Sequence, residues 1–109
     1  MREGGTMDKK FHIAVAVNDV EATVREYSRR LGAAPALVIA GEYALWRTET
    51  LNFSIRKTKD APGVVRHVGW EDSGATGFTR ETDTNGLLWE HFTEHDQREE
   101  IARLWPAAI

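Results

Sequence analysis

Three residues in this sequence carry the side chains of a small metal centre: His12, His67 and Glu90. Two imidazoles and one carboxylate form a ligand set for Fe(II), Mn(II), Ni(II), Co(II) or Zn(II) that leaves coordination positions open for an oxygen ligand. Each of the three falls in a segment with the alternation of a β-strand, and both histidines share a strand face with Ala or Gly, as cavity-lining residues do. Because they are 67 − 12 = 55 and 90 − 67 = 23 positions apart, only the tertiary fold can bring them together.

The composition excludes several other kinds of protein. The chain has 109 residues, enough for one domain, and 14 basic against 17 acidic residues give a net charge of −3, which argues against a nucleic-acid partner. Cysteine is absent, so any metal must be held by His and carboxylate side chains. The longest apolar runs have five residues, whereas a membrane-spanning helix needs about 20. We therefore expect a soluble cytoplasmic protein with no membrane partner.

The pattern predicts one α+β domain over residues 10–109, preceded by a disordered leader over residues 1–9. Strand-like segments recur along the domain and are separated by turns rich in Gly, Pro, Asp and Asn. The expected strands are 11–17, 35–40, 43–49, 51–57, 64–72, 78–83 and 87–92. The second, third and fourth of these indicate an antiparallel meander.

Two segments have helical periodicity instead. The first spans residues 18–32, with Asn18 as its expected N-cap. The second spans residues 93–105 and has an apolar stripe that should dock on the sheet. We expect this second helix to cover the outer face of Val68 and Trp70, where the second half of the chain has no helix of its own.

The opening segment KFHIAVAVNDVEATVREYSRRLGAAP resembles the first module of the vicinal oxygen chelate superfamily, with its strand, Asp-containing turn, helix and Leu-Gly stop. The segments VRHVGWE and DTNGLLWEHF are similar to the strands that carry ligands in the second module. The superfamily includes glyoxalases, extradiol dioxygenases, fosfomycin-resistance proteins and bleomycin-binding proteins, built from βαβββ modules whose sheets enclose a cavity. The resemblance implies a glyoxalase-like βαβββ module followed by a truncated three-strand second module and a C-terminal helix, because only SGATG and FTRET separate His67 from Glu90.

The resemblance also assigns roles to residues. It implies that His12, His67 and Glu90 hold one divalent metal ion (Fe, Mn, Ni, Co or Zn) and that the substrate is a small molecule with vicinal oxygens. Ser54 stands close to where glyoxalases add a carboxylate ligand from the first module. A three-ligand site of the dioxygenase or lyase type is therefore a better match than a glyoxalase site.

Other side chains are candidates for substrate binding. We expect Trp46, Ser54 and Arg56 to contact the substrate, with Trp46 on the wall of a ligand pocket and Arg56 facing an anionic group. Arg47 is a second candidate for the anionic group, and Glu71 is a candidate general base. The alternatives are core packing for the tryptophan and solvent-facing strand positions for the charged residues.

A metal-free protein is the alternative to a metal-dependent enzyme. Like the bleomycin-resistance members, it would bind a small organic ligand in a dimer groove lined by Trp and small residues. A third reading is a scaffold that binds a protein partner through an exposed sheet edge. Because the short second module leaves sheet edge and apolar surface uncovered, we expect a homodimer.

Overall fold

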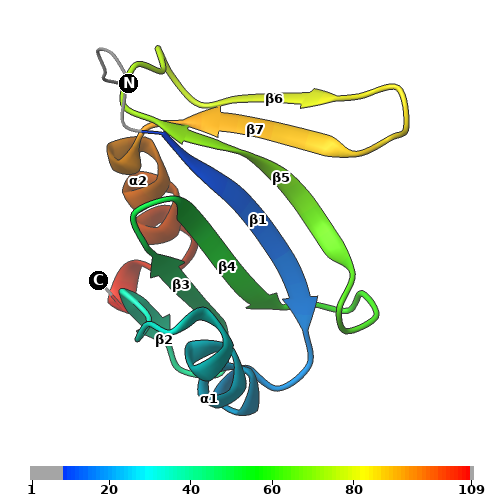
Figure 1. Cartoon of the computed structure of the whole chain (residues 1–109), viewed down its shortest axis with the longest axis vertical. Helices are drawn as coiled ribbons and strands as arrows, with labels where there is room; N and C mark the ends of the chain where they lie inside the picture. The colour runs from blue at the N-terminus through cyan, green and yellow to red at the C-terminus, as the bar shows by residue number, and fades with distance from the viewer. Residues whose placement is uncertain (1–8, 109) are drawn as a thin grey trace.

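The structure, a computed structural model, describes residues 9–108 and has the expected α+β architecture (Figure 1). Its elements are β1 (Lys9–Val17), α1 (Val20–Leu31), β2 (Leu37–Ile39), β3 (Tyr43–Arg47), β4 (Leu51–Lys57), β5 (Val65–Asp72), β6 (Thr79–Thr82), β7 (Leu88–Phe92), α2 (Glu94–Leu104) and the 3-10 helix η1 (Pro106–Ala108). Lys9 already belongs to β1, so the expected start of the domain at residue 10 is wrong by one position; the rest of the expected leader lies outside the described residues. None of the helices in residues 9–108 is long and apolar enough to cross a membrane.

One mixed sheet contains all seven strands, in the order β2-β3-β4-β1-β5-β7-β6 (Figure 1). Strands β2, β3 and β4 form the expected antiparallel meander. β1 pairs parallel with β4, β5 pairs parallel with β7, and β1 and β5 meet antiparallel at the centre. The sheet thus has two halves, and in each half the last strand lies parallel to the first and beside it.

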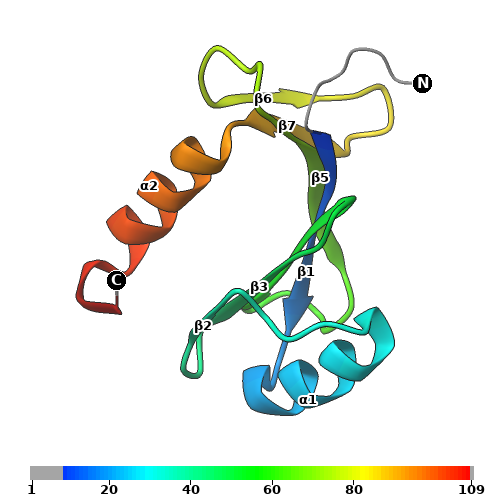
Figure 2. The same cartoon turned by 60° about the vertical axis from the view of Figure 1, so that its left-hand side comes forward.

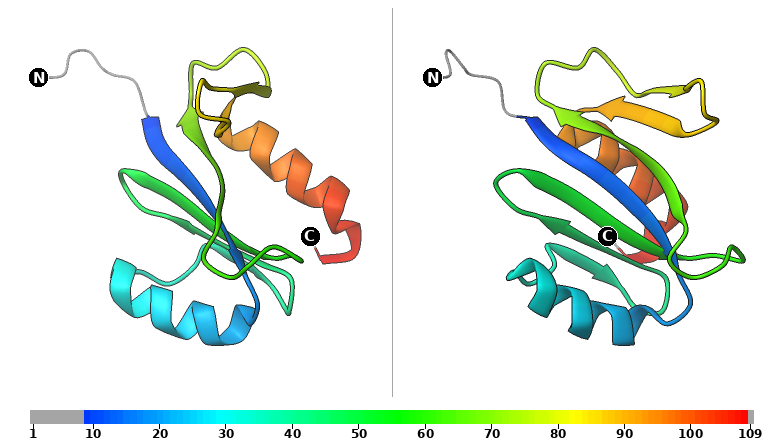
Figure 3. Two further views of the ribbon diagram at one scale, coloured as in Figure 1. Left: turned by 90° about the vertical axis from the view of Figure 1, so that its right-hand side faces the viewer. Right: turned by 45° about the vertical axis from the view of Figure 1, so that its right-hand side comes forward.

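Helix α1 covers one face of the first half of the sheet (Figure 3). Its N-cap is Asp19, whose carboxylate accepts a hydrogen bond from the Ala22 N–H at 3.0 Å, so the expected cap at Asn18 is wrong by one residue. The cap satisfies a main-chain donor that the first helical turn leaves free. The core between α1 and the sheet consists of Val20 of the helix and of Val15, Val17, Ala44, Trp46 and Ile55 of the strands.

Helix α2 lies against the opposite face of the sheet (Figures 2 and 3). It begins with a reciprocal capping box, in which Thr93 accepts from the Asp96 N–H and Asp96 accepts from the Thr93 N–H, both at 3.0 Å. Ile101, which is 4% exposed, packs against Tyr43 and Leu45 of β3. The C-terminal helix therefore crosses over the first half of the sheet.

The expectation that this helix covers Val68 and Trp70 is wrong. Strand pairing places these residues opposite Ile13 and Phe11 of β1, on the α1 side of the sheet. Trp70 is 39% exposed and packs edge-on against Phe11, with ring centroids 5.1 Å apart. This apolar face of the second half has no helix over it in the described part of the chain.

Candidate metal centre

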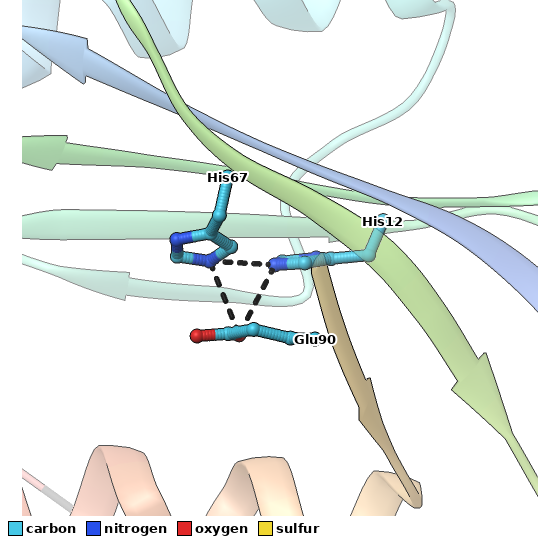
Figure 4. A group of neighbouring side chains, drawn as sticks. All are labelled: His12, His67 and Glu90. Carbon is cyan, nitrogen blue, oxygen red and sulfur yellow. Dashed lines mark hydrogen bonds and ion pairs between the residues drawn. The ribbon is translucent and has the colours of Figure 1, made fainter. Parts of the chain in front are cut away.

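His12, His67 and Glu90 converge beneath α2, although they come from three different strands (Figure 4). The Nε2 atoms of the two histidines are 3.0 Å apart. Glu90 Oε1 is 3.2 Å from His67 Nε2 and 3.9 Å from His12 Nε2. Two nitrogen ligands at right angles, each about 2.1 Å from a metal ion, are about 3.0 Å apart. The triad thus brings two nitrogens and one oxygen together at a spacing that suits one ion.

Strand register explains this convergence. His12 pairs with Gly69 across β1 and β5, and Gly69 pairs with Glu90 across β5 and β7. His67 lies two residues before Gly69 and therefore on the same face of β5. A Cβ atom on Gly69 would lie 1.9 Å from the main-chain oxygen of Glu90, so only glycine permits this approach of β7. Neighbouring strands thus bring together residues that are far apart in the sequence.

The orientation of the His12 ring is fixed by Asn52 of β4. The Nδ1–H of His12 donates to the side-chain oxygen of Asn52 at 2.8 Å and to its main-chain oxygen at 3.1 Å. The amide nitrogen of Asn52 in turn donates to Glu71 at 2.7 Å and to Gln97 at 2.8 Å, which fixes the orientation of the amide. Because the proton is on Nδ1, the Nε2 lone pair of His12 points into the triad.

Two residues that support the site, Asn52 and Gln97, are not among the candidates predicted from the sequence. Asn52 shares its strand face with Ser54 and Arg56, so the alternation of β4 could have revealed it. Gln97 carries no such signal, because it belongs to α2, whose position over this face of the sheet cannot be read from the helical period.

Glu71, a candidate general base in the sequence, is held in place by hydrogen bonds at the edge of the site. Its carboxylate accepts two hydrogen bonds from Arg47, at 2.7 and 3.0 Å, besides the one from Asn52. Burial raises the pKa of Glu71, but the hydrogen bonds from Arg47 and Asn52 outweigh burial and leave the pKa below its ordinary value. Arg47 also pairs with Glu94 at 3.3 Å. Glu71 and Arg47 are therefore ion-paired with each other, and each also contacts one further residue, Asn52 or Glu94.

The environment of the triad keeps its imidazoles neutral. Burial lowers the pKa of His12, although the hydrogen bonds to Asn52 oppose this shift. Burial, and then the neighbouring His12 and Arg66, lower the pKa of His67 to about 3. Burial raises the pKa of Glu90, while Arg80, whose Nε donates to Glu90 Oε2 at 3.1 Å, opposes that rise. Neutral imidazole is the form that binds a metal ion.

A cavity of about 210 Å³ contains the triad and is closed on one side by residues of α2. Ser54 and Arg56, two of the predicted substrate contacts, line this cavity. Trp46 does not: its side chain is fully buried under α1, on the other face of the sheet, and its indole N–H donates to Ser28 at 3.2 Å. The expectation that Trp46 lines this cavity is therefore wrong, because the alternation of β3 directs it into the core.

Arg66 lines the cavity too, and the regular alternation of a strand does not predict it. Ala14 of β1 pairs with His67, but the next residue, Val15, pairs with Val65. Arg66 is thus the extra residue of a β-bulge, a feature that re-aims side chains near functional sites. Consecutive residues 66 and 67 consequently both reach the same cavity.

The cavity therefore combines three potential metal ligands, hydroxyl groups from Tyr43 and Ser54, and several guanidinium groups. Such a site can hold an ion, bind electron-rich oxygens and donate hydrogen bonds to them. In comparisons with known proteins, no protein-family model matches the chain, and no curated protein matches it in sequence.

Proposed function

We propose that this chain is a small metal-dependent enzyme of the vicinal oxygen chelate type. His12, His67 and Glu90 would hold one divalent ion, chosen from Fe, Mn, Ni, Co and Zn. The observation that carries this proposal is the 3.0 Å separation of two histidine Nε2 atoms beside the Glu90 carboxylate. When bound, the ion would act as a Lewis acid that polarises two adjacent oxygens of a small substrate.

The topology supports this assignment. The elements β1, α1, β2, β3 and β4 follow the order of a βαβββ module, and β5, β6 and β7 form a shorter second unit. His12 lies on the first strand of the first half, His67 on the first strand of the second half and Glu90 on its last strand. We infer a glyoxalase-like arrangement with a shortened second module, in which α2 closes the cavity.

Three protein ligands, rather than four, fit the register of the two halves. Glu90 pairs with Gly69, which is two residues beyond His67. The residue two positions beyond the first-strand histidine of the other half is Ala14, and it pairs with Ser54. A serine therefore stands where symmetry would place a second carboxylate. This favours open coordination positions, and hence a dioxygenase or lyase type of reaction over a glyoxalase type.

The chain's own residues would prepare the site for such a reaction. Asn52 holds His12 in the tautomer that directs Nε2 at the ion, and Arg80 holds one carboxylate oxygen of Glu90 so that the other faces the histidines. Burial raises the pKa of the Tyr43 hydroxyl far above its ordinary value, so this group stays protonated and can donate to a substrate oxygen. Helix α2 excludes bulk water from the α2 side of the cavity.

The metal-free alternative, a groove lined by tryptophans, has less support. Trp46, Trp70 and Trp89 all belong to the sheet face opposite the triad. The remaining tryptophan, Trp105, lines the cavity but lies against Arg56. The groups around the cavity are mainly charged or hydrogen-bonding, which suits a metal and a polar substrate better than an apolar drug-like ligand.

Metal analysis of untagged protein, purified without chelator and then reconstituted with each of the five ions, tests this function. We expect close to one ion per chain in the wild type and none in His67→Ala. His95→Ala is the matched control, because His95 is 73% exposed and lies outside the cavity. A wild type that binds none of the ions would contradict the proposed function.

A further inference from the structure

Within residues 9–108, two arginines of the cavity have no ion-pair partner. Arg56 of β4 and Arg66 of β5 both line the cavity that contains the triad, and both are only partly exposed. The arginine ion pairs within residues 9–108 are made by other side chains: Arg30, Arg47, Arg80, Arg98 and Arg103. Withdrawing a charged group from water without a partner is costly. The two guanidinium groups are therefore available to a ligand.

The fold places the guanidinium groups of Arg56 and Arg66 at the cavity. The β-bulge in β5 puts Arg66 into the cavity beside His67, where a regular strand would turn it to the other face. The guanidinium of Arg56 lies over the ring of Trp105, 5.1 Å from the ring centroid. A cation–π contact of this kind attracts the guanidinium to the face of the ring and holds it at the cavity.

The other charges of the cavity already neutralise one another in part. Arg80 contacts both carboxylates that line the cavity, Glu90 and Glu100, each at 3.1 Å. The two carboxylates exceed the single charge of Arg80 by one, and the two positive charges of Arg56 and Arg66 outweigh that excess, so the cavity is net positive. A divalent ion at the triad would add two more positive charges. Such a field selects an anion. Guanidinium groups match the oxygens of carboxylate and phosphate with parallel hydrogen bonds.

We propose that Arg56 and Arg66 form an oxyanion subsite beside the triad, and that the substrate carries a carboxylate or phosphoryl group near its vicinal oxygens. The vicinal oxygens rest on the function proposed above, whereas the oxyanion subsite does not require a metal. The cavity volume of about 210 Å³ is below the roughly 300 Å³ at which pockets for drug-sized ligands begin. The substrate is therefore a small, negatively charged molecule.

Oxyanion binding to metal-free protein tests this subsite directly. Inorganic phosphate is titrated calorimetrically into the wild type, Arg56→Gln, Arg66→Gln and Arg25→Gln, all dialysed against EDTA. Arg25 is exposed on α1 and serves as the matched control. We expect saturable binding to the wild type and the control, and binding weakened by roughly tenfold or more in either cavity variant. Arg66→Lys, which keeps the charge, should recover part of the affinity.

A parallel titration with acetate identifies the class of oxyanion. Tighter binding of acetate indicates a carboxylate group on the substrate, and tighter binding of phosphate indicates a phosphoryl group; either result supports the subsite. Equal binding by the wild type and both glutamine variants overturns it, as does the absence of saturable binding for both anions. Circular dichroism melts check whether each variant is folded. If Arg66→Gln is unfolded, the phosphate affinity of Arg56→Gln decides the test.

Titration of the same variants with Co²⁺ separates this proposal from the metal centre. Arg56→Gln and Arg66→Gln keep all three ligands and should bind Co²⁺ as the wild type does. If Co²⁺ does not bind but phosphate binding still depends on the two arginines, the metal centre is refuted and the oxyanion subsite stands. If Co²⁺ binds but the phosphate affinity is the same in the wild type and in both arginine variants, the subsite alone is refuted.

Discussion

Gly69 and Glu90 face each other across β5 and β7 so closely that a Cβ atom on Gly69 would lie 1.9 Å from the Glu90 carbonyl oxygen. This close approach of β7 to β5 also helps to determine how far Glu90 Oε1 lies from His67 Nε2, which is 3.2 Å. We expect Gly69→Ala to push β7 outward, to destabilise the fold by about 1–3 kcal/mol and to weaken Co²⁺ binding by at least roughly tenfold. Thermal melts and Co²⁺ titration measure the two effects.

Substitution of a second glycine, Gly41, distinguishes the effect of a steric clash from the effect of backbone strain. Gly41 has a φ of 73°, which an L-residue adopts with strain, but a Cβ there would meet nothing within 4 Å. Gly41→Ala should therefore lower the melting temperature without altering the Co²⁺ affinity. If both variants lose Co²⁺ affinity in proportion to stability, the close approach at Gly69 has no special part in the metal centre.

Replacing Asn52 tests whether the tautomer of His12 matters for metal binding. Asn52→Ala removes the side-chain oxygen that accepts the His12 Nδ1–H. It also removes the amide group that donates to both Glu71 and Gln97. Loss of such a supporting hydrogen bond typically reduces metal affinity by roughly 10- to 100-fold. We expect a loss of this size in Co²⁺ titrations at fixed pH, made at a temperature where urea unfolding shows that the variant is folded. Unchanged Co²⁺ affinity would show that the ring needs no such partner.

The stability of the protein should depend on Glu71 in mild acid. Because the folded pKa of Glu71 lies below its ordinary value of 4.5, the unfolded chain takes up a proton at higher pH than the folded chain does. The contribution of Glu71 to the free energy of unfolding is therefore fully present above about pH 4.5 and is lost as the pH falls through the folded pKa. Urea unfolding of the wild type and Glu71→Gln between pH 7 and pH 3 should show a stability difference that shrinks on acidification. A difference that does not change with pH would contradict this role.

The elements and the ligand types could be predicted from the sequence because both depend on local pattern. Alternation located the strands that carry His12 and His67, and Thr93 marked the start of α2. The N-cap of α1 was misplaced by one residue, since Asn18 and Asp19 are adjacent and both have capping side chains. Such local errors leave the faces of the strands unchanged.

Features that depend on long-range packing could not be predicted from the sequence. The helical period shows which side chains of α2 are apolar, but not which face of the sheet they meet, so the position of α2 over Tyr43 rather than Trp70 required the structure. The bulge that turns Arg66 into the cavity interrupts the alternation without a Gly or Pro to signal it. Trp46 was misplaced for a related reason: a large aromatic in a strand suits a pocket wall and a core equally.

No helix of residues 9–108 covers the apolar face of the second half, and we therefore expect a homodimer. Phe11, Trp70 and Trp89 form an aromatic cluster on this face, with Phe11 lying 5.1 Å from Trp70 and 6.4 Å from Trp89 between ring centroids. Burying this cluster against a second copy would remove apolar surface from water. Light scattering after size exclusion should give twice the chain mass for the wild type and the single-chain mass for Trp70→Lys. Val38→Lys, at a residue of β2 that is 44% exposed, is the control and should remain dimeric; a monomeric wild type would refute the dimer.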